Sequence, residues 1–417
     1  MVRYTADTHV VVHPLSRQPD AGGILVGRKD LGVFLLLPED AVEVLDDLAQ
    51  GKSVGEAATI YHQRHGVTPD LDDLLTSLEQ RDFVRPLLAG GEPFHADLPD
   101  LAGRPATLKS FHFDWISPRW AARLCGWPVL TAGGLLVLLA ATAVFLKPSL
   151  APGWRAAYFP NKTAAGLLFL MVLGLFTTFL HEMAHLIAAR SRGISCRFGI
   201  STQLWFLVWE TDMTGIWSLP RRQRYLPILA GPLLDLLTAS ALVLAGFAQA
   251  SGWIPLSPRV LQLGRALLLI YLLRLAWQCY FFLRTDFYYA LSNLFGCKSL
   301  MKDTKVFLRN AVAHVLRIGK VTDQSHIPAV ERRMIPVYSV IWIVGRGLAF
   351  AMLLFIQIPL LFHYMTLAVD KFRHGTPSAG GGDSTVPIIT AIFFSIFFLS
   401  GFGLWIKQLW PKKGSSA

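Results

Sequence analysis

Apolar residues are distributed in two different ways along the chain. Up to about residue 88 they form short runs between polar turns, whereas from about residue 118 onward they form long runs. A helix needs ~20 residues to cross ~30 Å of hydrocarbon, and six runs reach that length. The chain is therefore predicted to be mainly α, with a polytopic bundle of about six transmembrane helices. The runs are Leu124–Leu146, Ala164–Ala189, Tyr225–Ala248, Val260–Phe282, Ile335–Phe362 and Val386–Ile406.

The first 88 residues predict a small α+β domain. A capping box, Ser53-x-x-Glu56, starts one helix, and Gly66 ends it. Pro69 is expected near the first turn of the next helix, which carries several leucines on one face. Residues 89–117 are expected to form a linker, and residues 118–417 the membrane domain. The expected elements are Thr8–Val12, Gly23–Val26, Gly32–Leu37, Glu39–Gln50, Ser53–His65, a third helix with Leu71, Leu74, Leu75 and Leu78 on one face, and a strand at Phe83 and Val84.

Composition supports a membrane protein with two unlike parts. Of the 417 residues, 53% are hydrophobic and only 16% are charged, whereas soluble domains are about a quarter charged. Residues 1–100 carry 8 Lys and Arg against 17 Asp and Glu, and the remainder carries 31 against 11. Nucleic acid is an unfavourable partner for the acidic part, while the basic part suits loops at an anionic membrane surface. The polar segment Met1 to Pro19 predicts no cleavable signal peptide.

Basic residues orient the predicted spans. They cluster between the second and third spans, between the fourth and fifth, and after the sixth, and these loops share one side if there are six spans. The positive-inside rule then predicts a multi-pass membrane protein with both termini in the cytoplasm. The segment Met301 to Lys320 is predicted either as an amphipathic helix on the membrane surface or as a plain connector.

An HExxH motif, His181-Glu182-Met183-Ala184-His185, lies near the end of the second apolar run. Histidines four residues apart share a helix face, so their imidazoles can bind one Zn²⁺. Glu182 can then take a proton from the metal-activated water as the water attacks a carbonyl. A chance match is the alternative, but ionisable groups at membrane depth are costly and functional by default. His181 is 17 residues beyond Ala164, about 25 Å along a helix, which predicts a site in the cytoplasmic third of the membrane.

A catalytic zinc usually has three protein ligands and a water, so a third ligand is needed. Asp286 is the first choice, because it follows the fourth apolar run at the level predicted for His181. Glu210 is the rival, since some zinc proteases take a Glu downstream of the motif. Asp212 and Asp235 are weaker candidates, and the alternative for Asp286 is a solvated carboxylate or a partner of Arg284.

An HExxH motif inside a membrane run, with an Asp in a later run, resembles the site-2 protease family of intramembrane metalloproteases. Ala230-Gly231-Pro232 resembles the AGP segment of that family, and Arg284 to Tyr289 resembles its second motif, TDGYY. Glu210 to Met213, with Trp217 and Pro220, resembles the intervening segment of a bacterial peptide-processing branch. The resemblance spans about Ala164 to Leu300 and implies Asp286 as the third ligand. Phe287 stands where the family usually has Gly, and Asp235 where many members have Asn.

The acidic N-terminal part resembles PqqD-like domains, which hold the leader peptides of ribosomally made, modified peptides. The resemblance implies a winged-helix-like fold, and the predicted orientation of the spans makes this domain cytoplasmic. The matching stretch is Gly32 to Val84, and the match is one of pattern without a catalytic signature. Such a domain could bind a peptide by adding it to an exposed strand edge. By analogy with the same protease family, Trp205 to Trp209 is expected to form a strand that lines the substrate.

These features predict a zinc metalloendopeptidase that cuts a peptide or protein substrate near the cytoplasmic face of the membrane. The favoured version removes the leader of a ribosomally made peptide, which the N-terminal domain would hold. Regulated intramembrane proteolysis of a membrane-bound regulator is a second version. Two other classes are a non-catalytic peptide chaperone or export partner and, more weakly, a transporter that uses intramembrane charges.

Overall fold

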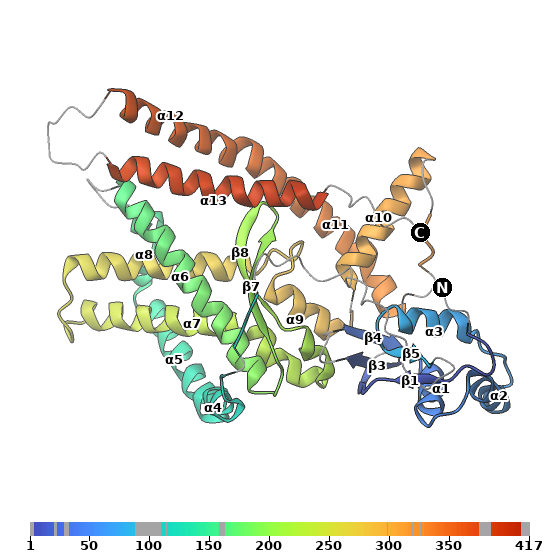
Figure 1. Cartoon of the computed structure of the whole chain (residues 1–417). Coiled ribbons are helices and arrows are strands. Elements are labelled where there is room, and N and C mark those ends of the chain that lie inside the picture. Colours follow the sequence, from blue (N-terminus) through green and yellow to red (C-terminus); the bar gives the residue numbers. More distant parts are fainter. Residues whose placement is uncertain are drawn as a thin grey trace. The chain divides into compact units, whose positions relative to one another are not determined.

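A computed structural model describes most of the chain as two compact units (Figure 1). The first unit contains Met1–Thr107 together with Met213–Arg224, and the second contains Leu108–Asp212 and Tyr225–Ala417. Most of the predicted linker lies outside the described residues. These are 4–20, 23–28, 33–87, 110–113, 115–157, 163–297, 299–317, 321–324, 327, 329–374 and 385–409.

The first unit combines three helices with two small antiparallel sheets. β1 (Val10–Val12) pairs with β5 (Val84–Pro86), while β2 (Ser16–Asp20), β3 (Gly23–Arg28) and β4 (Val33–Leu37) form a sheet in that order. The helices are α1 (Glu39–Ala49), α2 (Val54–His65) and α3 (Leu71–Glu79). Their apolar faces enclose a core in which Val26, Leu45, Leu75, Leu78 and Phe83 are fully buried.

Local sequence signals explain the ends of these helices. The capping box is confirmed, since Ser53 Oγ accepts from the Glu56 N–H and the Glu56 carboxylate accepts from the Ser53 N–H. Gly66 ends the same helix in the left-handed conformation. Pro69 lies near the start of α3 as expected, directly before the N-cap Asp70, whose side chain accepts from the Asp73 N–H.

A segment far along the sequence belongs to this first unit. The short helix η3 (Thr214–Ser218) contacts strands β2, β3 and β4. Arg224 is only 2% exposed, and its guanidinium donates two hydrogen bonds of 3.1 Å to Asp20 Oδ2. It also donates to the Trp217 carbonyl and lies over the Trp217 ring. Arg224, which the sequence assigns to a basic loop, is therefore a buried member of an ion pair.

The second unit is mainly helical, as the sequence predicts. Five helical segments are long and apolar enough to cross a membrane: Pro118–Leu146, Leu168–Arg190, Arg221–Ala250, Pro258–Trp277 and Val330–His363. Large apolar side chains on their surfaces, such as Phe145 at 85% exposed and Phe355 at 78%, suit contact with lipid. The helices are α4 (Pro118–Leu124), α5 (Trp127–Leu146), α6 (Thr163–Arg190), α7 (Arg221–Ala250), α8 (Pro258–Trp277), α9 (Asp286–Phe295), α10 (Leu300–Leu316), α11 (Ala329–Met352), α12 (Ile358–His374) and α13 (Thr385–Leu409).

Two predicted spans differ from these helices in detail. The fourth was expected to reach Phe282, but α8 ends at Trp277 and turns toward α9. The fifth runs from α11 through a π-helical turn, Leu353–Gln357, into α12. The sixth coincides with α13, which is not among the five segments, so the number of spans stays a prediction. The segment beginning at Met301 forms α10, which packs against α11.

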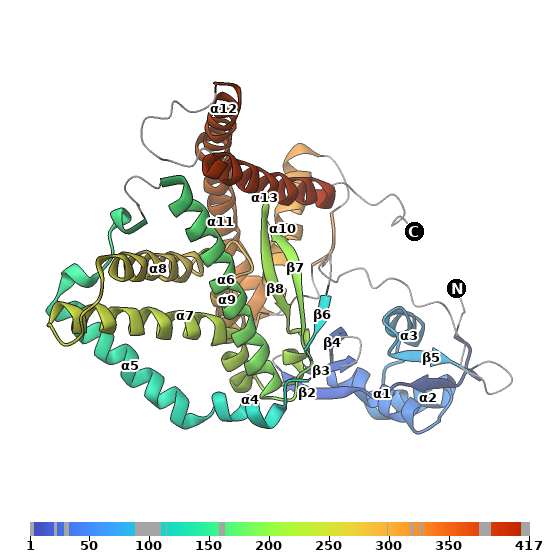
Figure 2. The same cartoon turned by 60° about the vertical axis from the view of Figure 1, so that its left-hand side comes forward.

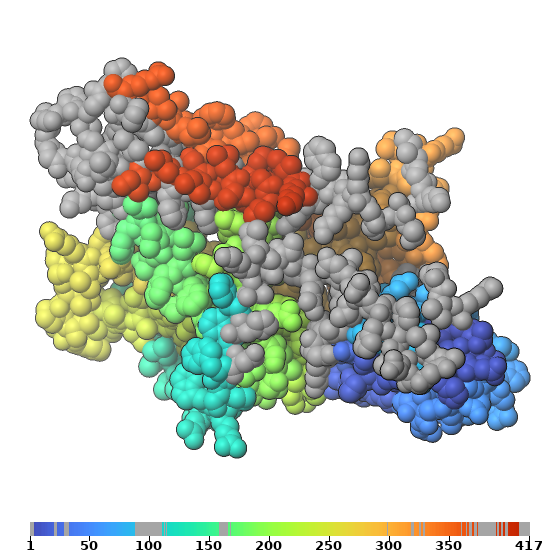
Figure 3. Space-filling model, in the orientation of Figure 1, coloured from blue at the N-terminus to red at the C-terminus, as the bar shows by residue number. Residues whose placement is uncertain are grey.

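A three-stranded antiparallel sheet lies against the helices of this unit (Figure 2). Its order is β6 (Ser110–His112), β7 (Arg197–Gln203) and β8 (Phe206–Asp212), so β8 is an edge strand. The strand expected at Trp205 to Trp209 is present as β8. α6 contacts β8 on one side and also contacts α13, whose side chains lie beside those of α6 at the surface (Figure 3).

Candidate metal centre

Two histidines lie on the buried face of α6. His181 and His185 are one turn apart, and they are only 3% and 2% exposed. Their Nε2 atoms are 3.2 Å apart, on a helix that is mostly apolar. The spacing of the motif thus brings two imidazole nitrogens to one point, as the sequence predicts.

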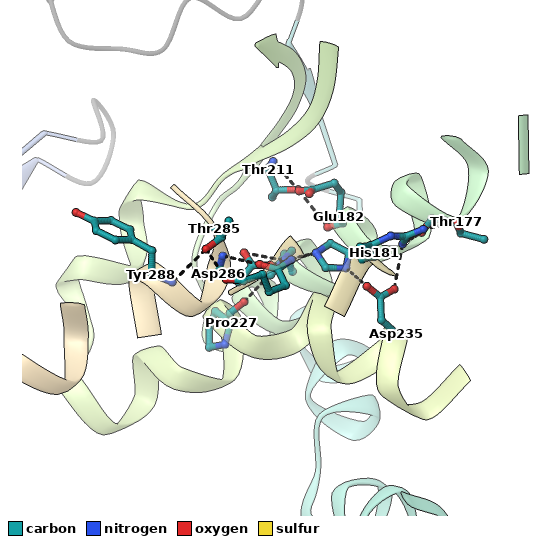
Figure 4. A network of polar contacts seen from close by, with 12 residues as sticks. Thr177, His181, Glu182, Thr211, Pro227, Asp235, Thr285, Asp286 and Tyr288 are labelled. Carbon is teal, nitrogen blue, oxygen red and sulfur yellow. Dashed lines mark hydrogen bonds and ion pairs between the residues drawn. The ribbon is translucent and has the colours of Figure 1, made fainter. Parts of the chain in front are cut away.

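Asp286 reaches the same point from the first residue of α9. Thr285 caps this helix, because its hydroxyl accepts from the Tyr288 N–H at 3.3 Å. The Asp286 N–H donates to Gln278 Oε1 at 3.0 Å. Its carboxylate oxygens lie 3.1 Å from His181 Nε2 and 3.3 Å from His185 Nε2 (Figure 4).

These three side chains form a group that could hold a metal ion. One ligand atom from each of His181, His185 and Asp286 lies within 4.8 Å of the others. Burial alone would raise the pKa of the Asp286 carboxyl, but the imidazoles of His185 and His181, when protonated, hold that pKa well below its usual range. The group therefore offers one anionic oxygen and two imidazole nitrogens.

The hydrogen bonds behind the rings fix which nitrogen faces the group. His185 Nδ1 lies 2.7 Å from the Pro227 carbonyl oxygen, and His181 Nδ1 lies 2.7 Å from Asp235 Oδ2. A carbonyl and a carboxylate only accept hydrogen bonds, so each Nδ1 carries the proton. In the neutral rings the Nε2 lone pairs then point toward Asp286, which is the arrangement that a metal ion needs.

Gly231 on α7 provides space beside these nitrogens. A Cβ atom at this position would lie 2.4 Å from the Nε2 atoms of both His181 and His185. A side chain here would therefore occupy the volume into which both lone pairs point. The glycine belongs to the Ala230-Gly231-Pro232 segment, whose sequence alone does not explain why a glycine is needed.

Glu182 is attached to the edge strand β8. Its Oε2 accepts a 2.9 Å hydrogen bond from the Thr211 N–H, and its backbone carbonyl accepts from the Thr211 hydroxyl at 3.1 Å. These two bonds tie the motif of α6 to β8 (Figure 4). The carboxylate is therefore held next to the metal-binding group rather than within it.

The other sequence candidates occupy different places. Glu210 and Asp212 lie on β8, outside the group that could hold a metal ion. Asp235 contacts Nδ1 of His181 and so lies behind the ring. Thr211, Gln278 and Arg274 complete the surroundings of the site. Only Arg274 carried a sequence signal, namely a charge within an apolar run.

Comparison with known proteins gives no match to a family model, to a curated protein or to a solved structure. The resemblance to the site-2 protease family therefore stays an expectation, based on the motifs quoted above.

Proposed function

We propose that this chain is a membrane-embedded zinc metalloprotease that hydrolyses a peptide bond near the cytoplasmic face of the membrane. The close approach of the three ligand side chains carries the proposal. Ligands about 2.0–2.1 Å from a tetrahedral zinc ion lie about 3.3 Å from one another. The two histidine Nε2 atoms are 3.2 Å apart, Asp286 Oδ2 lies 3.1 Å from His181 Nε2, and Asp286 Oδ1 lies 3.3 Å from His185 Nε2. Three protein ligands also leave a fourth position for water or substrate, as in catalytic zinc sites.

The side chains divide the chemistry between them. His181, His185 and Asp286 would hold the zinc ion, which supplies polarisation of the substrate carbonyl and acidification of a water. Glu182 would accept the proton of the attacking water and return it to the leaving amine. Its bond to the Thr211 N–H supports this role, because it keeps the carboxylate directed beside the ligands.

The favoured substrate is a ribosomally made peptide from which a leader is removed. The acidic first unit supports this version, since residues 1–100 carry 17 Asp and Glu against 8 Lys and Arg. Its sheet in the order β2-β3-β4 has two edge strands, and a peptide can be bound by adding a strand to such an edge. An acidic domain favours a leader with basic segments.

The test is a cleavage assay on the full chain in lipid nanodiscs, with a candidate leader-bearing peptide and metal analysis of the same samples. Wild type is expected to contain one zinc per chain. Glu182→Gln is expected to keep that zinc and to lower the cleavage rate by about 10²–10⁴-fold, the usual contribution of a general base.

Two results would contradict the proposal. The first is a wild-type protein without stoichiometric zinc. The second is a Glu182→Gln variant that cleaves as fast as wild type. If the wild-type protein instead bound the peptide without cleaving it, the non-catalytic chaperone class would be favoured. Glu210→Gln, on the strand beside the site, is the matched control and should retain zinc.

A further inference from the structure

A buried charged network lies behind His181. Arg274 belongs to the apolar helix α8, and its side chain is 13% exposed. Its guanidinium donates to Asp235 Oδ1 at 3.0 Å, to the Thr177 carbonyl at 2.8 Å and to the Thr177 hydroxyl. The other oxygen of Asp235, Oδ2, lies 2.7 Å from His181 Nδ1 (Figure 4). The contacts therefore run from α8 through α7 to the metal-binding face of α6.

Stability alone does not account for this network. Asp235 is fully buried within α7, and ionised groups inside a membrane bundle are costly to desolvate. Well-packed apolar residues in place of a buried ion pair are often neutral or stabilising. A buried pair that also contacts a candidate metal ligand is better explained by its effect on that ligand.

The two ligand histidines are held by acceptors of different charge. His185 donates to the neutral carbonyl of Pro227, whereas His181 donates to the carboxylate of Asp235. A carboxylate behind a metal-binding imidazole fixes its tautomer and orientation and raises its basicity as a ligand. His181 is therefore expected to be the stronger of the two imidazole ligands.

We propose that Asp235 and Arg274 are positioning residues. Asp235 holds His181 with its Nε2 lone pair toward His185 and Asp286, and Arg274 holds that carboxylate in place, so that the pair strengthens binding of a divalent cation. The proposal rests on the metal site of the proposed function.

The experiment measures Co²⁺ binding to the full chain in nanodiscs, by visible absorption and by competition with a chelator, so it needs no peptide substrate. Asp235→Asn keeps an oxygen that accepts from His181 but removes the charge. It is expected to weaken Co²⁺ binding 10–100-fold, as is common when such a partner is changed. It should also alter the ligand-field spectrum.

A double variant separates positioning from stability. Arg274→Met alone leaves a buried carboxylate unpaired, so the metal-free protein should unfold at a lower temperature. Asp235→Asn with Arg274→Met removes both charges and should recover that temperature, while Co²⁺ binding stays 10–100-fold weaker than in wild type. Arg265→Met on the same helix is the matched control, since Arg265 is exposed, and should change neither measurement.

Three outcomes would overturn this inference. Asp235→Asn could bind Co²⁺ with the wild-type affinity and spectrum, or the double variant could recover affinity together with stability. In both cases the metal site itself would stand and only the role of the pair would fall. A wild-type protein that binds no Co²⁺ or Zn²⁺ would instead overturn the proposed function, and this inference with it.

Discussion

At the scale of single residues, the centre depends on three ligand side chains and on one glycine. Two imidazole nitrogens from α6 and a carboxylate from α9 lie close together, and Gly231, which has no side chain, leaves the space beside them open. The two carboxylates proposed as the third ligand, Asp286 and Glu210, differ in their distance from the histidine nitrogens. Only Asp286 lies within 3.3 Å of both histidine Nε2 atoms.

Replacing Asp286 should therefore cost metal, whereas replacing Glu210 should not. Asp286→Asn removes the anionic ligand and is expected to weaken zinc binding by more than about 100-fold, beyond the usual effect of an outer partner. Glu210→Gln should bind zinc with the wild-type affinity. Zinc titration of both purified variants against a fluorescent chelator checks this, and the reverse order of affinities would assign the third ligand to Glu210.

A methyl group at position 231 should exclude the metal. Gly231→Ala places a Cβ about where both Nε2 lone pairs point, at the 2.4 Å separations given above. Metal content measured by mass spectrometry should fall below about one tenth of wild type, which corresponds to a loss of at least ~1.4 kcal/mol in binding. Gly264→Ala on α8 meets no atom within 4 Å and serves as the control. Full metal occupancy in Gly231→Ala would contradict the placement of the ion beside Gly231.

At the scale of elements, periodicity predicts some features well and cannot reveal others. The histidine spacing and the capping box are local patterns, so they could be predicted from the sequence. β2 was missed because Ser16-Arg17-Gln18-Pro19-Asp20 is polar and lacks alternating apolar positions. The pairing of Asp235 with Arg274 joins two helices, and no local pattern encodes such a contact.

The end of α8 shows the same limitation. Apolar and aromatic residues continue from Trp277 to Phe282, so hydropathy extends the predicted helix past its true end. The helix ends because Gln278 makes two hydrogen bonds to the start of α9. Its side-chain oxygen accepts from the Asp286 N–H, and its backbone carbonyl accepts from the Thr285 hydroxyl. Gln278 thus fixes where α9, and with it Asp286, begins.

Gln278→Leu should destabilise this junction. It leaves the Asp286 N–H without its partner, and a buried unsatisfied donor costs about 1–3 kcal/mol. The expected result is a lower thermal unfolding temperature and weaker zinc binding, measured on the same preparation. Gln249→Leu near the end of α7 replaces the same residue type at a half-buried position and should change zinc binding little. Unchanged zinc affinity in Gln278→Leu would show that Asp286 is positioned without this bond.

At the scale of the whole molecule, the first unit is not continuous in sequence. It includes Met213–Arg224, which begins 96 residues beyond the end of the predicted linker at residue 117. Deleting residues 1–107 would therefore remove a peptide-binding candidate and also expose the side of η3 that packs on β2, β3 and β4. Point substitutions on the edge strands β2 and β4 test leader binding without that side effect.

The ion pair inside this unit should be worth several kcal/mol. Asp20→Ala leaves Arg224 buried without its carboxylate, and breaking a buried pair in this way costs about 3–5 kcal/mol. Asp46→Ala breaks the exposed pair with Arg17 and should cost at most about 1 kcal/mol. The protection of amides in β2 to β4 against hydrogen exchange measures the loss of stability in both variants. Equal protection in the two variants would show that Arg224 does not stabilise this sheet.

The hydrogen bond from the Thr211 main chain to Glu182 determines what a mutational scan can detect. Every amino acid except proline keeps the N–H that holds this carboxylate. An alanine scan would remove the hydroxyl contact of Thr211 but leave the amide donor intact, and position 211 would be scored as tolerant. The alignment of the proposed base is thus encoded by the path of the backbone, so it can persist among sequences that share no side chain there.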